Sequence, residues 1–281
     1  MNSKIHLRHL IAADLEFADS LRTLAGWNQT PGDWQRFLAC EPRGCFLAEW
    51  EGSPAGTATT TRYGTELAWI GMVLVHPDYR RRGIGQALLH HCLDSLQDVS
   101  CIKLDATPLG KMLYEQCGFR EEWTLTRWEG TPLELPASET QPWETSSAAV
   151  VDELDAQAFG VSRLTKLEHL ARQSRAALIS KDMAGKITGF GMLREGARAL
   201  YLGPVVASSP EAGRTLVLSL AAHTGGRLIY WDIPDLNSAA AELARQLGLR
   251  PQRQLLRMHR GQNRHPGNPL LPFAIADPAI G

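Results

Sequence analysis

The residues whose types and spacing could support chemistry lie in the polar turn 76–85, His-Pro-Asp-Tyr-Arg-Arg-Arg-Gly-Ile-Gly. An apolar run, 69–75, precedes the turn, and apolar residues follow it at helical spacing. Backbone N–H groups at the start of a helix have no partner within the helix and carry the positive end of its dipole. Gly83 and Gly85 leave room for phosphate oxygens to approach this backbone. The pattern predicts a phosphate or pyrophosphate site; the alternative is a solvated basic turn that caps an ordinary helix.

Two common nucleotide-binding patterns are excluded at this turn. It lacks the Gly-Lys-Ser/Thr end of a Walker A loop. It also lacks the GxGxxG fingerprint of a dinucleotide-binding fold.

The turn instead resembles motif A of the GCN5-related N-acetyltransferase (GNAT) superfamily, Q/R-x-x-G-x-G/A. Arg80, Gly83 and Gly85 stand at its defining positions. Further along, the run 113–119, Leu-Tyr-Glu-Gln-Cys-Gly-Phe, is similar to motif B of that family, L-Y-x-x-x-G-F. The resemblance covers residues 4–130, and the second half looks like a diverged copy of the same fold.

The resemblance implies acetyl-CoA as cosubstrate, with no metal. Backbone N–H groups from Arg81 to Gln86 would hold the pyrophosphate, and the strand before the turn would pair with the pantetheine arm. One N–H of that strand would polarise the thioester carbonyl. Tyr114 would donate a proton to the departing thiolate; the alternative is a packing tyrosine. The implied cofactor-binding residues are Val73, Leu74, Val75, Arg80, Arg81, Arg82, Gly83, Ile84, Gly85 and Gln86.

The general base and the acceptor site are less defined. Many family members carry a glutamate where this chain has Trp69. Asp105 follows the next strand, and it would either face the acceptor or cap the following turn. The family usually builds its acceptor pocket at the loop between the first two helices. The candidate acceptor residues are Trp27, Asn28, Tyr63, Asp105 and Arg163, each with a packing, turn or surface role as the alternative.

Strand and helix patterns predict an α/β protein. The chain is strand-rich at first and then has βαβ character, which favours layers around a mixed central sheet. In the first half we expect strands near 5–10, 45–50, 55–62, 66–75, 102–106 and 122–128, and helices near 12–24, 33–39, 83–97 and 110–117.

The segment 131–147 carries three prolines and many small polar residues, so it is predicted to be a linker. The two sides of it share a strand ending in aspartate, then a glycine, then an arginine at a matching interval (Asp105, Gly118, Arg127; Asp232, Gly248, Arg257). This repeat predicts two tandem GNAT-like domains, each α/β (α+β layered). The expected organisation is 1–130 with the acetyl-CoA site, 131–147 linker, 148–261 degenerate copy and 262–281 extended tail, packed by Leu270, Leu271, Phe273 and Ile275.

The second copy is predicted to bind no CoA productively. Thr215 and Val217 align with Gly83 and Gly85, and their side chains would crowd a phosphate. Ala244 stands where the first copy has its tyrosine.

Composition narrows the class of protein. The net charge of −1 argues against a nucleic-acid partner, and no apolar run is long enough for a membrane span. The N-terminus has no apolar signal core, and the five cysteines form no CxxC pair, so we expect a cytoplasmic protein with free thiols.

The sequence therefore predicts an N-acetyltransferase that moves an acetyl group to a primary amine of a small molecule or peptide, by direct transfer in a ternary complex. Two alternatives stay open: an acyltransferase with another acyl-CoA or a thiol-precursor acceptor, similar to mycothiol synthase, and a non-catalytic CoA-sensing protein. The acceptor and the oligomeric state are left open.

Overall fold

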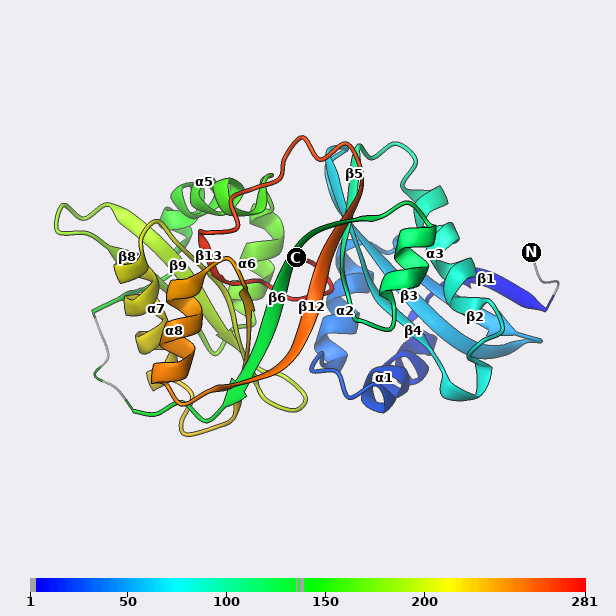
Figure 1. Cartoon of the computed structure of the whole chain (residues 1–281), viewed down its shortest axis with the longest axis horizontal. Coiled ribbons are helices and arrows are strands. Elements are labelled where there is room, and N and C mark those ends of the chain that lie inside the picture. Colours follow the sequence, from blue (N-terminus) through cyan, green and yellow to red (C-terminus); the bar gives the residue numbers. More distant parts are fainter. Residues whose placement is uncertain (1–3, 135, 137–138) are drawn as a thin grey trace.

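The computed structural model describes residues 4–134, 136 and 139–281. Residues 1–3 of the predicted first domain, and positions 135, 137 and 138 of the predicted linker, lie outside the described residues. The described chain forms two lobes joined by one continuous mixed β-sheet (Figure 1).

The elements of the first half are β1 (Ile5–His9), η1 (Ala12–Asp14), α1 (Leu15–Leu24), α2 (Pro31–Cys40), β2 (Cys45–Trp50), β3 (Ser53–Tyr63), β4 (Leu67–Val75), η2 (Pro77–Tyr79), α3 (Ile84–Ser95), β5 (Cys101–Ala106), α4 (Lys111–Gln116) and β6 (Arg120–Gly130). Those of the second half are β7 (Gln141–Pro142), η3 (Thr145–Ser147), α5 (Ala148–Phe159), α6 (Leu164–Arg172), β8 (Ala176–Lys181), β9 (Ile187–Arg194), β10 (Leu200–Ala207), α7 (Pro210–Ala222), β11 (Ile229–Pro234), α8 (Ser238–Gln246), β12 (Arg250–Gly261) and β13 (Pro272–Ala274).

The strands and helices expected in the first half are present, with ends shifted by a few residues. The main difference is at 12–24, where a 3₁₀ turn precedes α1. The carboxylate of Asp14 accepts the backbone N–H of Ile11 at 2.9 Å there, which caps the turn. Local signals place α2 well: Thr30 and Asp33 form a reciprocal capping box, and Pro31 takes the first helical position.

One strand of each half, β6 of the first and β12 of the second, is exchanged with the other half. The order through the centre of the sheet is β5-β12-β6-β11, so β12 pairs with β5 and β6 pairs with β11. Both of these pairings are antiparallel. Figure 1 shows β6 and β12 side by side between the lobes. The sequence boundary between the halves is therefore not a boundary in the sheet.

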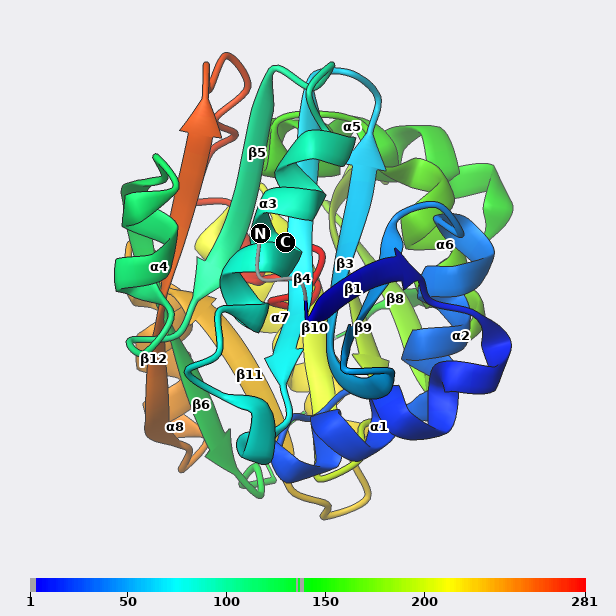
Figure 2. The same ribbon diagram turned by 90° about the vertical axis from the view of Figure 1, so that its right-hand side faces the viewer.

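Each lobe has its own core on one face of the sheet, and the two lobes share a third. In the first half, α3 packs across β3 and β4 (Figure 2). Alternate residues of β2 face opposite cores: Phe46 points toward α3, and Leu47 joins the shared core. The shared core combines Trp34 of α2 with Phe190 of β9. Because its members come from both halves, we expect the halves to unfold together.

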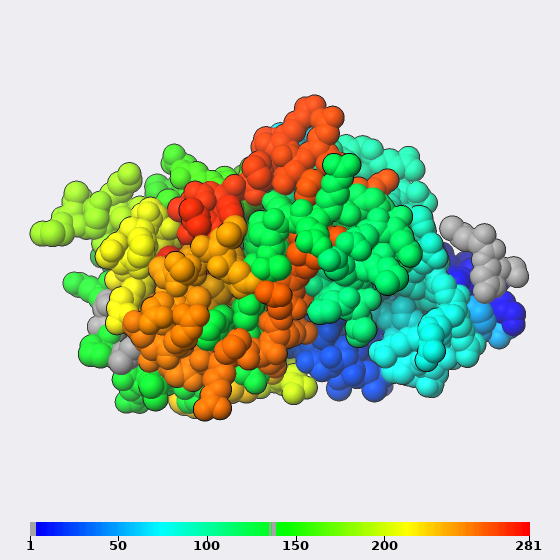
Figure 3. All heavy atoms as spheres, in the orientation of Figure 1, coloured from blue at the N-terminus to red at the C-terminus, as the bar shows by residue number. Residues whose placement is uncertain are grey.

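The tail runs back across the junction. Figure 3 shows the orange and red part of the chain, from β12 onward, lying over the boundary between the lobes. Phe273 and Ile275 are buried, as predicted for this tail, but Leu270 is 60% exposed. Leu270 stays outside because β13, which anchors the tail to β10, begins only at Pro272.

Candidate active site

The turn after β4 leads directly into the N-terminus of α3. Gly83 is the N-cap, with φ of 85°, in the left-handed region that glycine tolerates best. The first bond of the helix runs from the N–H of Ala87 to the carbonyl of Gly83, at 2.9 Å. The N–H groups of the preceding residues of α3 have no partner within the helix. A side chain at Gly83 would meet no atom within 4 Å, so the space above this backbone is open.

Three arginines, residues 80–82, lie in the turn before this helix. Arg80 donates to the carbonyl of Val75 at 3.3 Å, and Arg82 donates to the carbonyl of Asp78 at 3.1 Å. Arg81 has φ of 58° and is exposed. Alternation of left- and right-handed backbone turns N–H groups toward one point, which is a common way of binding anions. The turn is thus suited to a pyrophosphate.

Two features of β4 open the sheet beside this turn. The parallel pairing of β4 with β5 covers only Leu67–Trp69, so the strands separate beyond Trp69. In addition, β4 has a bulge opposite β3, where the register shifts between Thr57 and Thr59 and Met72 takes φ of 50°. A bulge leaves part of the hydrogen-bond ladder unpaired. The bulge thus interrupts the ladder beside this opening, and the carbonyl of Met72 there accepts the Thr57 hydroxyl at 3.0 Å.

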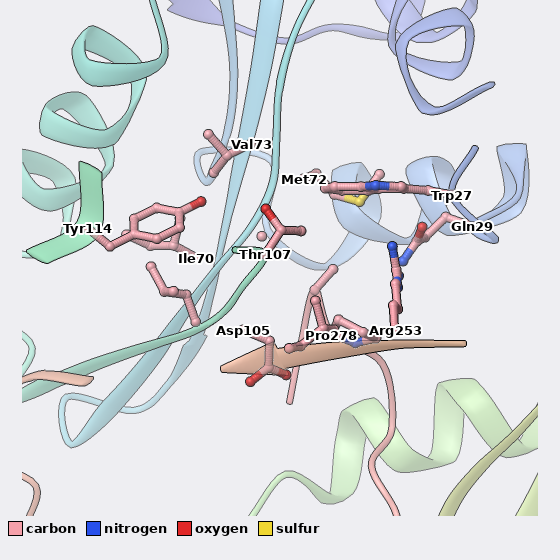
Figure 4. A pocket seen from close by; sticks show the side chains of 14 residues that line it. Trp27, Gln29, Ile70, Met72, Val73, Asp105, Thr107, Tyr114, Arg253 and Pro278 are labelled. Atoms are coloured by element: carbon pink, nitrogen blue, oxygen red, sulfur yellow. The ribbon is translucent and has the colours of Figure 1, made fainter. Parts of the chain in front are cut away.

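A pocket of about 570 Å³, part of it open to solvent, occupies this opening (Figure 4). Its walls come from the β4 bulge, the end of β5, α4, β12, the α1–α2 loop and the tail. The lining residues are Trp27, Gln29, Ile70, Gly71, Met72, Val73, Leu104, Asp105, Thr107, Tyr114, Arg253, Leu255, Pro278 and Ala279.

Tyr114 reaches the pocket from α4. Its ring packs against Phe119, with centroids 6.0 Å apart, and Figure 4 shows its hydroxyl directed toward the middle of the pocket. Burial raises the pKa of Tyr114 to about 12, so the phenol keeps its proton at neutral pH. A protonated hydroxyl at this place is able to serve as a proton donor.

The structure separates the two acceptor candidates of the α1–α2 loop. Trp27 lines the pocket, whereas the amide of Asn28 is engaged with the second half. Asn28 accepts the N–H groups of Arg198 and Ala199 at 2.9 and 3.0 Å, and it donates to the Ala199 carbonyl. The expected contact of Asn28 with an acceptor is thus replaced by a link between the halves.

Tyr63 and Arg163 also lie outside this pocket and have internal partners. Tyr63 is buried and donates to the carbonyl of Ile280 at 2.6 Å. Arg163 binds both carboxylate oxygens of Asp155, at 2.7 and 3.0 Å, and also the carbonyl of Gly281. These bonds fix the tail between the halves.

Asp105 lines the pocket, but its carboxylate is fully buried and paired with Arg257 of the exchanged strand β12. Both Arg257–Asp105 bonds measure 2.9 Å. Burial raises the pKa of Asp105, and the Arg257 guanidinium opposes that rise. The carboxylate of Asp105 therefore binds Arg257, and it does not cap the following turn, which was one of the two roles expected from the sequence.

Trp69, at the position of the family glutamate, is buried and donates its indole N–H to the carbonyl of Pro278 at 3.0 Å. The tail therefore covers the position at which the sequence resemblance led us to look for a glutamate base. Within the described pocket lining, the remaining titratable groups are those of Asp105, Tyr114 and Arg253.

Sequence reasoning missed two polar residues of the pocket, Gln29 and Arg253. Gln29 donates to Asp277 at 2.9 Å, which leaves its own carbonyl oxygen buried without a partner. The Nε of Arg253 is likewise buried without a partner. The alternation of side chains along a strand could have identified Arg253. It lies two residues before the apolar Leu255, so both side chains are on the same face of the strand.

The matching end of the second half differs in the length of its turn. Ser208 and Ser209 alone separate β10 from α7, whereas residues 76–83 separate β4 from α3. Thr215 and Val217 lie inside α7, so the expected match of these residues to the two glycines of the first turn was wrong. The second turn is therefore shorter than the first. Pro210, which lacks an N–H, and Glu211 occupy the first positions of α7.

The tail fills the opening between β10 and β11. Their parallel pairing covers only Leu200 and Tyr201 on β10, which is the same early separation as in the first half. Here β13 pairs with β10, and Ile275 donates its N–H to the carbonyl of Asp232 on β11 at 3.1 Å. The ring of Phe273 lies so close to Gly213 of α7 that a Cβ there would overlap it. A segment of the chain thus occupies the space that is open in the first half.

No cluster of three or more His, Cys, Asp or Glu side chains suited to a metal ion was found among residues 4–134, 136 and 139–281. None of the helices in that same part of the chain combines the length and the apolar character needed to cross a membrane.

The fold and site define a class of protein. Residues 14–119 match the model of the Acetyltransferase (GNAT) family, and residues 151–269 match that of an Acetyltransferase (GNAT) domain. The chain belongs to the GNAT superfamily, with two GNAT domains in tandem. The predicted α/β fold of two mixed sheets flanked by helices is confirmed, with the two sheets joined into one.

Two curated proteins are similar to this chain. YitH of Bacillus subtilis (strain 168), an uncharacterized N-acetyltransferase, is 26% identical over 191 residues, which is 65% of this chain and 66% of YitH, just under two thirds. Holothin acyltransferase of Pseudoalteromonas sp. (strain SANK 73390) is 23% identical over 84% of this chain and 81% of that protein.

Solved structures extend the similarity to the whole chain. A candidate acetyltransferase from Pyrococcus horikoshii matches 100% of this chain and 97% of its own, with a TM-score of 0.85 and 26% identity. A tandem GNAT protein from the clavulanic acid biosynthesis pathway matches 97% of this chain and all of its own, with a TM-score of 0.66 and 17% identity, a likeness of fold alone.

Proposed function

We propose that this chain transfers an acetyl group from acetyl-CoA to a primary amine, at the pocket of the first half. The observation that carries the proposal is that the β4 bulge and Tyr114 line one pocket, and that β4 leads from this pocket directly to the turn at the N-terminus of α3. GNAT proteins generally use acetyl-CoA, and each of these parts suits one portion of that cosubstrate.

The N–H groups from Arg81 to Gln86 would bind the pyrophosphate, with the arginines of the turn adding positive charge. The pantetheine arm would lie along Val73–Val75, where β4 has parted from β5. A backbone N–H of the bulge would donate to the thioester oxygen and stabilise the negative charge that develops on it. Removing one such donor typically lowers the rate by about two to three orders of magnitude.

Transfer then needs no covalent enzyme intermediate. The amine nitrogen attacks the carbonyl carbon, the new C–N bond forms, and the C–S bond breaks. Tyr114 gives its proton to the departing thiolate and recovers one from solvent, while the amine loses one proton to water. The products are the N-acetylated amine and free CoA.

The second half is proposed to bind no CoA. Its turn is too short to present a row of N–H groups, and its own tail occupies the opening between β10 and β11. In this proposal its contribution to the site is the exchanged strand β12, which supplies Arg253 and Leu255 to the pocket.

The test is turnover with a panel of primary amines, measured by CoA release and by mass spectrometry of the acylated product. The account predicts N-acetylated product from at least one class of amine. Because one relative is named an acyltransferase, propionyl-CoA and longer acyl-CoA esters belong in the same panel. Binding of acetyl-CoA without turnover of any amine would support the CoA-sensing alternative instead.

A further inference from the structure

The Arg253 guanidinium has no hydrogen-bond or ion-pair partner among the residues that the structure describes, although its side chain is half-buried and its Nε is fully buried. Figure 4 shows Arg253 rising from β12 toward the side of the pocket where Trp27 and Gln29 lie. Burying part of a charged group without a partner costs free energy, so an opposite charge from outside the chain would stabilise Arg253.

Nearby carboxylates do not fill this role. Asp232 binds Arg127 through both oxygens and also accepts from the Tyr201 hydroxyl. Asp277 accepts from Gln29 and from the N–H of Ala279. These bonds hold both carboxylates elsewhere. Burial, with Arg127 nearby, lowers the pKa of Arg253 to about 10, although the charges of Asp232 and Asp277 oppose this shift; the group stays charged at neutral pH.

The position of Arg253 separates it from the proposed phosphate site. The pyrophosphate would lie at the start of α3, with its own arginines at 80–82. Arg253 instead lies on the exchanged strand, on the acceptor side with the α1–α2 loop and the tail. Beside it, Gln29 has a buried carbonyl oxygen without a partner, which suits an N–H donor.

From this geometry we propose that the acceptor is an amino-carboxylate. Its carboxylate pairs with Arg253, and one of its N–H groups donates to Gln29. The inference rests on the proposed function and adds the chemical class of the acceptor. A guanidinium fork binds a carboxylate through two parallel bonds, which fixes orientation as well as charge. The second half thus takes part in selecting the acceptor.

The experiment uses amine pairs that differ in the carboxylate alone: phenylalanine with phenethylamine, lysine with cadaverine, and γ-aminobutyrate with propylamine. Binding to the full chain in the presence of CoA is measured by calorimetry, and kcat/KM by product formation. Hydrogen bonds to charged groups predict a preference of about 10- to 100-fold for the better carboxylates in the wild type. Arg253→Gln should reduce that preference to about 2-fold or less, and Arg253→Lys should restore part of it.

Arg250→Gln is the matched control, because Arg250 is an exposed arginine on the same strand. It should keep the full preference. The proposal is overturned if the wild type treats both members of each pair alike, if it binds none of the carboxylates, or if Arg253→Gln leaves the preference intact. Failure of the proposed function is distinct, since the wild type would then either bind no acetyl-CoA or bind it without acetylating any amine, with or without a carboxylate.

Discussion

Arg257 of the second half binds Asp105 of the first through two hydrogen bonds of 2.9 Å, inside the sheet. The converse pair joins Arg127 of the first half to Asp232 of the second, at 2.8 and 2.6 Å. The two bonded pairs are related by the internal repeat, and both follow from the exchange of β6 and β12. In each lobe, an aspartate near the end of a central strand therefore binds an arginine that comes from the other half of the sequence.

Breaking one pair is predicted to destabilise the whole chain. Arg257→Gln leaves Asp105, whose side chain is 0% exposed, without its partner, and such losses typically cost about 3–5 kcal/mol. The measurement is the free energy of unfolding in urea. Arg245→Gln, which breaks the exposed pair with Glu242, should change stability by less than about 0.5 kcal/mol. Equal effects of the two variants would contradict this account.

The same variant carries a prediction about pH. Burial already raises the pKa of Asp105, and without Arg257 it should rise further. Folded Asp105 then binds a proton at a pH where unfolded aspartate does not, so stability increases as pH falls through the folded pKa. The loss of unfolding free energy caused by Arg257→Gln should therefore be smaller at about pH 5 than at about pH 7. If the variant is destabilised equally at both pH values, the loss of the Arg257–Asp105 charge pair is not the cause of the destabilisation.

Two glycine-to-alanine changes should have opposite effects on stability. A Cβ at Gly85 would make ordinary contacts, the nearest at 3.7 Å from Val75, so the better helix former should add up to about 1 kcal/mol. A Cβ at Gly213 would overlap the Phe273 ring, and overpacking typically costs about 1–3 kcal/mol. Urea unfolding of both variants tests this. Stabilisation by Gly213→Ala would mean that the tail does not occupy the second opening.

Tyr114→Phe should lower kcat by about 100-fold or more, because it removes the proposed proton donor, while acetyl-CoA affinity stays near that of the wild type. The ring and its contact with Phe119 are kept, so stability should change little. Tyr230→Phe, in the second half, is the control. A kcat within about 2-fold of the wild type for Tyr114→Phe would assign the proton transfer to another group.

Thiol reagents should find few reactive groups in the folded chain. Cys45, Cys92 and Cys101 are buried, and burial raises the pKa of Cys45 to about 12 and that of Cys101 to about 11. Only Cys40 and Cys117, which are half-buried, are expected to react with a thiol reagent before unfolding. Cys117→Ser should remove one of these reactions. Rapid reaction of all five thiols in the folded state would contradict the core described here.

The sequence predicted the local structure of the first half because its signals are local. The apolar run of β4, the capping box at Thr30 and the glycines of the turn each act within a few residues. The repeat also matched Asp105 with Asp232, and Arg127 with Arg257, at the correct positions. It did not predict that each arginine bonds to the aspartate of the other half. The alternation of residues in a strand predicts which side chains face the core, but it does not predict which strand lies next to it in the sheet.

The candidate site was predicted in part for the same reason. The turn and Tyr114 belong to contiguous motifs; Tyr114 lines the pocket, and the turn follows β4, whose bulge forms one of the pocket walls. Gln29, Arg253 and Pro278 reach that pocket from parts of the chain that are distant in sequence. Asn28 looked like an acceptor contact, yet it bonds to Ala199, a residue far along the chain. Such contacts depend on tertiary packing, which no single motif encodes.

The central claim is tested most directly by calorimetry of acetyl-CoA binding to the wild type and to Gly83→Glu. Gly185→Glu is the control, because Gly185 is another glycine with positive φ and no neighbour within 4 Å of a Cβ. The account predicts one site per chain in the wild type and in Gly185→Glu, and no binding to Gly83→Glu, where a carboxylate would replace the phosphate. Two sites per chain, or unchanged binding by Gly83→Glu, would contradict it.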